Sequence, residues 1–170
     1  MNRYILYNKP KKIDLNKIPV HLAKAFSKFF KGLPYSTISL DTNFSGLVLF
    51  YQDETFDIEK RSKKIKILLD IQFKNDLKND EIKKITEDIL YLDKNSNFTF
   101  KSSELGVETT LYFQNSITEI LKKIDSLNID RVLISNLDKF EIPRGNYRVL
   151  KDIEVFNFKS LSHSPNKTPR

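Results

Sequence analysis

The chain has 170 residues, of which 39% are hydrophobic and 12% aromatic, enough for one domain with a substantial apolar core. It contains no cysteine and only two histidines, which excludes disulfide and thiol chemistry and argues against a zinc site. No apolar run approaches the roughly 18 residues that cross a membrane, and no signal-peptide core follows the N-terminus. We therefore expect no membrane partner.

The net charge of +7 is concentrated at the two ends of the chain. Residues 1–31 contain eight basic residues and one acidic residue, and residues 159–170 contain three basic residues and no acidic one. The residues between them carry a net negative charge. Basic ends favour a polyanionic partner, although lysine, asparagine and isoleucine are abundant throughout, so compositional bias explains part of the excess.

The first third of the chain predicts a strand, a helix and a second strand. Arg3 to Asn8 is a run rich in β-branched and aromatic residues, as is typical of a strand. From residue 19 to 31 the apolar residues recur at intervals of three and four, which places them on one face of a helix. Ile38 to Phe50 then reads as an apolar lead-in, a short polar turn and a buried strand.

The remaining two thirds alternate strands and helices. In order, we predict a strand at 65–73, a helix at 79–90, strands at 97–101 and 108–113, a helix at 116–127, strands at 131–135 and 139–142, and one terminal helical turn at 150–153. The sequence of residues 116–119 has the pattern of a capping box, which predicts the start of the helix at 116–127. The fold class is thus α+β, with a single domain over residues 1–158 and a mixed, mostly antiparallel sheet flanked by helices. Residues 159–170 are polar and basic and contain prolines, and we expect a disordered tail.

The turn between Ile38 and Phe50 carries the candidate site. Its sequence L-D-T-N-F-S-G-L (residues 40–47) delivers one carboxylate, Asp41, to the edge of a strand, where a rigid scaffold can aim it into a cleft. Gly46 suits a position that needs positive φ or close backbone approach. The turn also has a purely structural interpretation, an Asx turn in which Asp41 bonds its own backbone.

This turn resembles the central motif of the pseudouridine synthases, L-D-x-x-[ST]-x-G-L, and the closest type is the small ribosomal-RNA-directed RsuA/RluB-like family. Tyr4 to Pro10, Y-I-L-Y-N-K-P, resembles the opening strand of that family and its N-K-P turn. Ile142 to Leu150, I-P-R-G-N-Y-R-V-L, resembles its closing P-G-x-[YW]-R-x-L segment. The three segments lie in the family's order and span almost the whole chain, without the N-terminal S4-like domain that many members carry.

The resemblance implies isomerisation of uridine to pseudouridine in RNA. The uridine is flipped into a pocket, its N-glycosidic bond is broken, and the base is rejoined through carbon. The catalytic residue is Asp41, as nucleophile or as base, because a carboxylate can act as either. The reaction requires no metal and no cofactor. The implied partner is RNA, namely ribosomal RNA or the ribosome, in the cytoplasm or in an organelle, and we expect the free protein to be monomeric.

Three positions expected to bind the substrate depart from the family pattern. Ser39 stands where the family has the arginine that helps displace the target base, and a hydroxyl cannot replace a guanidinium. When Lys64 is aligned with the lysine of the family's K-x-Y-x-V element, Lys66 stands at the position of the tyrosine that packs against the base. If Lys66 points into the cleft, it should pair with Asp41. Leu121 stands at an arginine position of a Q-V-R-R-M-like helix. We therefore expect weak or absent catalysis.

The basic residues near these segments are predicted to contact RNA phosphates. They are Lys9, Lys11, Lys12, Lys60, Arg61, Lys63, Lys64, Lys122 and Lys123. Three functions remain open: a working pseudouridine synthase, a catalytically inactive relative that serves as a ribosome-associated or ribosome-assembly RNA-binding protein, or an unrelated basic α+β interaction domain with a chance motif match. The first two functions are distinguished by whether the protein modifies RNA in a way that requires Asp41.

Overall fold

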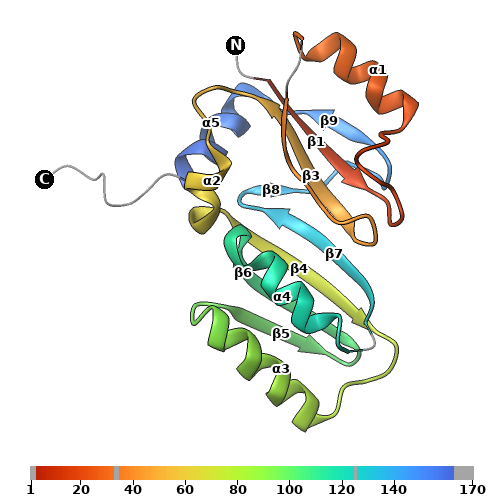
Figure 1. Cartoon of the computed structure of the whole chain (residues 1–170), viewed down its shortest axis with the longest axis vertical. Coiled ribbons are helices and arrows are strands. Elements are labelled where there is room, and N and C mark those ends of the chain that lie inside the picture. Colours follow the sequence, from red (N-terminus) through yellow and green to blue (C-terminus); the bar gives the residue numbers. More distant parts are fainter. Residues whose placement is uncertain (1–2, 33–34, 125, 163–170) are drawn as a thin grey trace, which may run out of the picture.

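Nine strands form one mixed sheet in the computed structural model, which describes residues 3–32, 35–124 and 126–162 (Figure 1). The strands are β1 (Arg3–Lys9), β2 (Ser36–Ile38), β3 (Ser45–Gln52), β4 (Lys66–Phe73), β5 (Asn97–Lys101), β6 (Glu104–Thr110), β7 (Ser126–Ile134), β8 (Leu137–Asp138) and β9 (Tyr147–Val149). The helices are α1 (Val20–Phe29), α2 (Ile58–Arg61), α3 (Asn79–Leu92), α4 (Gln114–Leu121) and α5 (Asp152–Leu161), with 3-10 turns η1 (Ser62–Lys64) and η2 (Leu111–Phe113).

The sheet consists of two halves joined by one short parallel pairing. Its order is β5-β6-β4-β7-β3-β1-β9, with β2 on β3 and β8 on β7. Every pairing is antiparallel except that of β3 with β7, where Ser45 lies opposite Asp130 and Gly46 opposite Arg131. The expected single α+β domain with a mixed, mostly antiparallel sheet is confirmed.

Gly46 makes this join possible. Its φ is 117°, and a Cβ built on it would lie 2.3 Å from the backbone oxygen of Arg131 and 2.5 Å from its nitrogen. Only glycine allows the two strands to approach so closely. Both reasons for expecting a glycine at this position, positive φ and close approach, are therefore confirmed.

The two halves of the sheet are covered differently. β1 and β3 are buried on both faces. Phe26 of α1 packs against Phe50 on one face, and Phe158 of α5 packs against Tyr4 on the other. β4 instead alternates buried and more exposed residues, as its sequence predicts. In Figure 1, α3 and α4 lie in front of this lower half of the sheet.

Several boundaries differ from the sequence prediction. The strand expected at 108–113 is β6, which ends at Thr110 and is followed by the 3-10 turn η2. Residues 139–142, also expected to form a strand, are loop and turn, because the short strand β8 ends at Asp138. The helix expected at 116–127 runs from Gln114 to Leu121, because the turn η2 leads directly into it, and β7 already begins at Ser126. Near the C-terminus, α5 extends to Leu161, where only one helical turn was expected.

The folded domain therefore continues past the predicted boundary at residue 158. The ammonium of Lys159 lies 2.8 Å from the carboxylate of Asp53, and Ser162 is buried. Residues 163–170, the remainder of the predicted tail, lie outside the described residues. None of the described helices combines the length and the apolar character needed to cross a membrane.

Candidate functional site

The three segments that carry the family resemblance meet in space. β1 lies between β3 and β9, and Lys9 at its end pairs with Gly46. The side-chain amide of Asn8 donates to the carbonyl oxygen of Ile142 at 2.7 Å, and Arg144 donates to the side-chain oxygen of Asn8 at 2.7 Å. The N-K-P turn, the central motif and the closing segment are therefore one structural unit.

Lys9 holds the loop that contains Asp41 (residues 39–44, called the motif loop below). The side chain is fully buried, and its ammonium donates to the carbonyl oxygens of Phe44 at 2.6 Å, Thr42 at 3.1 Å and Pro10 at 3.1 Å. Burial lowers its pKa to about 8, and the charge of Asp41 opposes this shift. The predicted contact between Lys9 and an RNA phosphate is wrong, because the ammonium faces the protein interior.

This burial predicts a pH dependence of stability that can be measured. The pKa of Lys9 is 10.5 in the unfolded chain and about 8 in the folded chain, so the folded protein binds fewer protons between these values. Stability must then rise with pH through this window, by about 3 kcal/mol for a shift of this size. Denaturant unfolding of the wild type and of Lys9→Met should show their difference in unfolding free energy moving in favour of the wild type from pH 8 to 10.5.

The matched control is Lys24→Met, which removes an exposed lysine of α1. Its difference from the wild type should stay flat over the same range. A flat difference for Lys9→Met as well would contradict the buried, charged ammonium.

Asp41 is exposed and lies in the loop between β2 and β3. One carboxylate oxygen accepts from the backbone N–H of Asn43 at 3.0 Å, and its carbonyl oxygen accepts from the N–H of Phe44 at 3.0 Å. The Asx turn of the structural interpretation is thus present, and it leaves the second carboxylate oxygen available. Asp41 and Ser39 line a shallow pocket of about 250 Å³ together with a second carboxylate, Asp14.

The structure does not bring Lys66 to Asp41. Lys66 is the first residue of β4, four positions from Asp70, which pairs through Asp130 with Ser45 at the start of β3. At about 3.3 Å per residue, that is about 13 Å along the strand. No lysine or arginine in 3–32, 35–124 or 126–162 forms an ion pair with Asp41. The expected pairing of Lys66 with Asp41 is wrong.

Leu121 is not a substrate-binding residue either. It is the last residue of α4 and is fully buried in the core. The helix α4 begins at Gln114, two residues before the start expected from the sequence.

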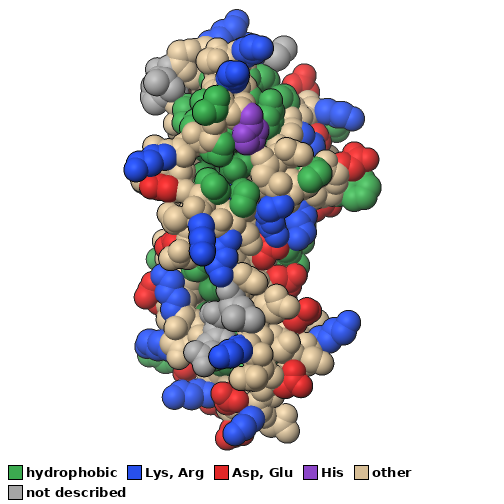
Figure 2. All heavy atoms as spheres, turned by 90° about the vertical axis from the view of Figure 1, so that its right-hand side faces the viewer, with side chains coloured by type: hydrophobic (Ala, Val, Ile, Leu, Met, Phe, Trp, Pro, Cys, Tyr) green, Lys and Arg blue, Asp and Glu red, His purple; other side chains and the backbone are tan. Residues whose placement is uncertain are grey.

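Several predicted RNA-binding lysines surround the motif loop. Phe44, at the [ST] position of the family motif, is buried, and the ammonium of Lys122 lies 5.6 Å from the centre of its ring. The backbone N–H of Lys12 donates to the carbonyl oxygen of Thr42 at 2.8 Å. Lys11 and Lys123 are exposed nearby in sequence. Figure 2 shows lysine and arginine side chains gathered across the middle of the face that lies on the right in Figure 1.

Arg131 is a residue that the sequence interpretation missed. Its guanidinium is fully buried and donates to the carbonyl oxygen of Leu47 at 2.7 and 2.9 Å, to that of Ile38 at 2.9 Å, and to the side-chain oxygen of Gln114 at 2.8 Å. Burial lowers its pKa to about 9, so it stays charged at neutral pH. Arg131 thus binds both ends of the motif loop. The only signal in the sequence was a pair of charged residues, Asp130 and Arg131, among the apolar residues of 129–134.

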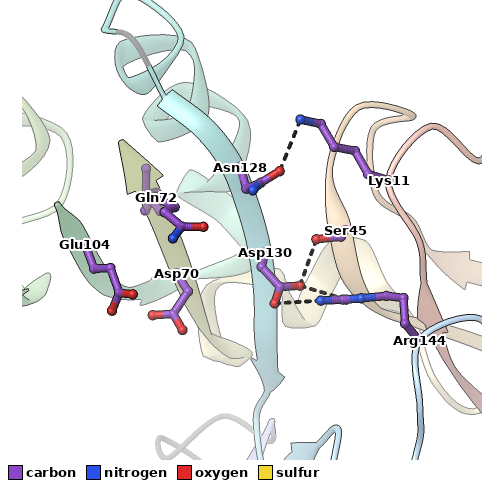
Figure 3. Close-up of a pocket in the computed structure, with 9 residues that line it drawn as sticks. Lys11, Ser45, Asp70, Gln72, Glu104, Asn128, Asp130 and Arg144 are labelled. Carbon is purple, nitrogen blue, oxygen red and sulfur yellow. Dashed lines mark hydrogen bonds and ion pairs between the residues drawn. The ribbon is translucent and has the colours of Figure 1, made fainter. Parts of the chain in front are cut away.

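A second polar cluster lies at the join of β3 and β7 (Figure 3). Asp130 accepts from the hydroxyl of Ser45 at 3.1 Å, from both terminal nitrogens of Arg144 at 3.0 and 3.1 Å, and from Lys139 at 3.1 Å. Burial favours the neutral form of Asp130, but Arg144 and then Lys139 outweigh it and lower the pKa. The cluster borders a cavity of about 350 Å³, in which burial, then Asp130 and Glu104, raise the pKa of Asp70.

Comparison with known proteins gives similarity in structure only. No protein-family model matches the sequence, and no curated protein matches it. A crystal structure of a pseudouridylate synthase matches with a TM-score of 0.63 and 16% identity, over 93% of this chain and 74% of that chain. The archaeal box H/ACA sRNP Nop10-Cbf5 complex matches with a TM-score of 0.46 and 13% identity, over 82% of this chain and 50% of that chain. An H/ACA RNP bound to a substrate RNA containing 2'-deoxyuridine matches with a TM-score of 0.44 and 12% identity, over 82% and 49%. The first likeness extends along almost the whole chain, and the protein has the fold of a pseudouridylate synthase.

Proposed function

We propose that this protein is an RNA-binding relative of the pseudouridine synthases that acts on, or binds to, ribosomal RNA. The observation that carries the proposal is the position of Asp41. It is exposed on a loop held by Lys9 and Arg131, in a domain that has the fold of a pseudouridylate synthase. The N-K-P turn and the closing segment lie beside the strand that follows this loop. We place the protein in the cytoplasm or in the ribosome of an organelle, monomeric when free.

We further propose that its isomerase activity is weak or absent. Asp41 could attack the sugar or remove a proton, but the groups that would assist it are missing. Ser39 stands where the resembled enzymes have an arginine, and Lys66 supplies no aromatic surface for a flipped uracil and lies far along β4. Parts of one catalytic unit do not act independently, so losing several of them costs several powers of ten in rate.

Pseudouridine mapping of ribosomal RNA tests this proposal. Cells that lack the gene, and the same cells complemented with the wild type or with Asp41→Asn, should show the same pattern of pseudouridines. Sedimentation should place both proteins in ribosomal fractions, because binding does not need the carboxylate. Lys66→Tyr alone should restore no activity.

One outcome would contradict the proposal of weak or absent activity. A pseudouridine that disappears on deletion, returns with the wild type and does not return with Asp41→Asn would make this protein a working synthase. If the protein neither changes the pattern of pseudouridines nor associates with RNA, an unrelated interaction domain becomes the better interpretation.

A further inference from the structure

A group of exposed lysines lies at the opposite end of β3 from Asp41. Lys60 of α2, Lys63 and Lys64 of η1, and Lys66 at the start of β4 are all exposed. The ammonium of Lys63 lies 4.7 Å from the centre of the Tyr112 ring, which is 54% exposed. We call these four lysines and Tyr112 the η1 surface.

Arg61, predicted to bind RNA with these lysines, does not belong to this surface. Its guanidinium donates to the carbonyl oxygen of Lys159 at 3.1 Å and to the hydroxyl of Ser162 at 3.4 Å, and lies over the ring of Phe56 at 5.4 Å. Arg61 therefore anchors α2 to α5 and leaves the lysines around it directed to solvent.

The lysines of the η1 surface have no acidic partners. None of them forms an ion pair within the part of the chain that the structure describes. The segment 60–66, K-R-S-K-K-I-K, contains no acidic residue. On α3, by contrast, two lysines alternate with four acidic residues, as expected for an ordinary solvated face. Repulsion among these lysines is reduced when a polyanion binds to them.

The position of the η1 surface separates it from the site at Asp41. β3 has eight residues, and at about 3.3 Å per residue it spans about 26 Å. The motif loop precedes this strand, whereas α2 and η1 follow it. In Figure 1, α2 lies at the left and β3 begins at the right. One nucleotide held at Asp41 cannot reach the lysines, so a ligand that contacts both must be a longer strand.

We propose that the η1 surface is a second RNA contact site, which binds single-stranded RNA that flanks the segment held near Asp41. The lysines contact phosphates, and Tyr112 offers a ring on which an unpaired base stacks. The ammonium of Lys63 lies over that ring, so a base that stacks there takes its place and leaves Lys63 next to the phosphate of the same nucleotide. This inference rests on the proposed function in one respect, namely that RNA is the partner.

Binding of a long fluorescent oligouridylate, measured over a range of salt concentrations, tests the inference. The variant Lys63→Gln/Lys64→Gln/Lys66→Gln should lower affinity at low salt about tenfold or more. It should also reduce the slope of log K against log salt by about 2, because each lost phosphate contact removes about 0.7 on single strands. Tyr112→Leu should lower affinity by roughly tenfold and leave the salt slope unchanged, because stacking releases no counterions.

The matched control is Lys78→Gln/Lys83→Gln/Lys84→Gln near and on α3, which removes the same charge from a face rich in acidic residues. It should change affinity less than twofold. Equal losses in the two triple variants would overturn the inference, because the effect would then follow net charge alone. Circular dichroism should show the same spectrum for all variants.

A third variant, Lys11→Gln/Lys12→Gln/Lys122→Gln, separates this inference from the proposed function. If it lowers affinity while the η1 variant is silent, RNA binding stands and the second contact site is wrong. If the wild type does not bind the oligouridylate at all, and also does not bind ribosomal RNA, both proposals are wrong.

Discussion

Gly46→Ala is expected to lower the free energy of unfolding by roughly 3 to 5 kcal/mol, because it combines a strained φ with a backbone clash. The new Cβ would lie 2.3 Å from the backbone oxygen of Arg131, and no side-chain rotation can relieve a contact between two strands. The clash falls on the only parallel pairing between the described strands. Since small domains have about 5 to 15 kcal/mol in total, urea unfolding should show a large part of the protein's stability lost.

Gly106→Ala is the matched control for this prediction. Gly106 lies within β6, and a Cβ there would meet its nearest neighbour, a side-chain atom of Thr99, at 3.6 Å, an ordinary van der Waals distance. Its cost should stay below about 1 kcal/mol. Equal costs at positions 46 and 106 would mean that the β3–β7 join tolerates a wider spacing than the structure has.

The sequence predicted those parts of the fold that depend on local pattern. The alternation in residues 65–73 identified the buried face of β4, and Gly46 could be recognised because few other roles explain a glycine between a polar turn and an apolar strand. The family motifs added the order of the segments. Their meeting around β1 follows from that order and from the antiparallel pairing of its neighbours.

The candidate site was harder to predict, because its residues are placed by contacts across the chain. Lys9 follows a strand and precedes a proline, which suits a surface turn, yet it is buried because the carbonyl oxygens of residues 42 and 44 cover it. Lys66 and Leu121 were placed by alignment on short motifs. The helix α4 begins at Gln114, two residues before its predicted start, and nothing in the local pattern marks these extra residues.

Arg131 shows the same limitation most clearly. In the sequence it is one of two adjacent charged residues, with Asp130, in an otherwise largely apolar strand, and a surface position on a half-buried strand would explain it equally well. In the structure its guanidinium has no carboxylate partner; it bonds to the carbonyl oxygens of Ile38 and Leu47 and to Gln114. Those two carbonyl oxygens belong to residues on either side of the motif loop. The position of Asp41 therefore depends on a residue far away in the chain.

Arg131→Met should accordingly destabilise the protein by about 3 to 5 kcal/mol, although it removes a buried charge and nearly preserves volume. The methionine leaves two buried carbonyl oxygens and the side-chain oxygen of Gln114 without a donor, and each unsatisfied group costs about 1 to 3 kcal/mol. Arg144→Met is the control: the Arg144 side chain is 40% exposed in its pair with Asp130, and its loss should cost only about 1 kcal/mol. Urea unfolding of both variants measures the two costs. If Arg131→Met is as stable as the wild type, desolvation of the guanidinium outweighs its hydrogen bonds, and Arg131 does not hold the motif loop in place.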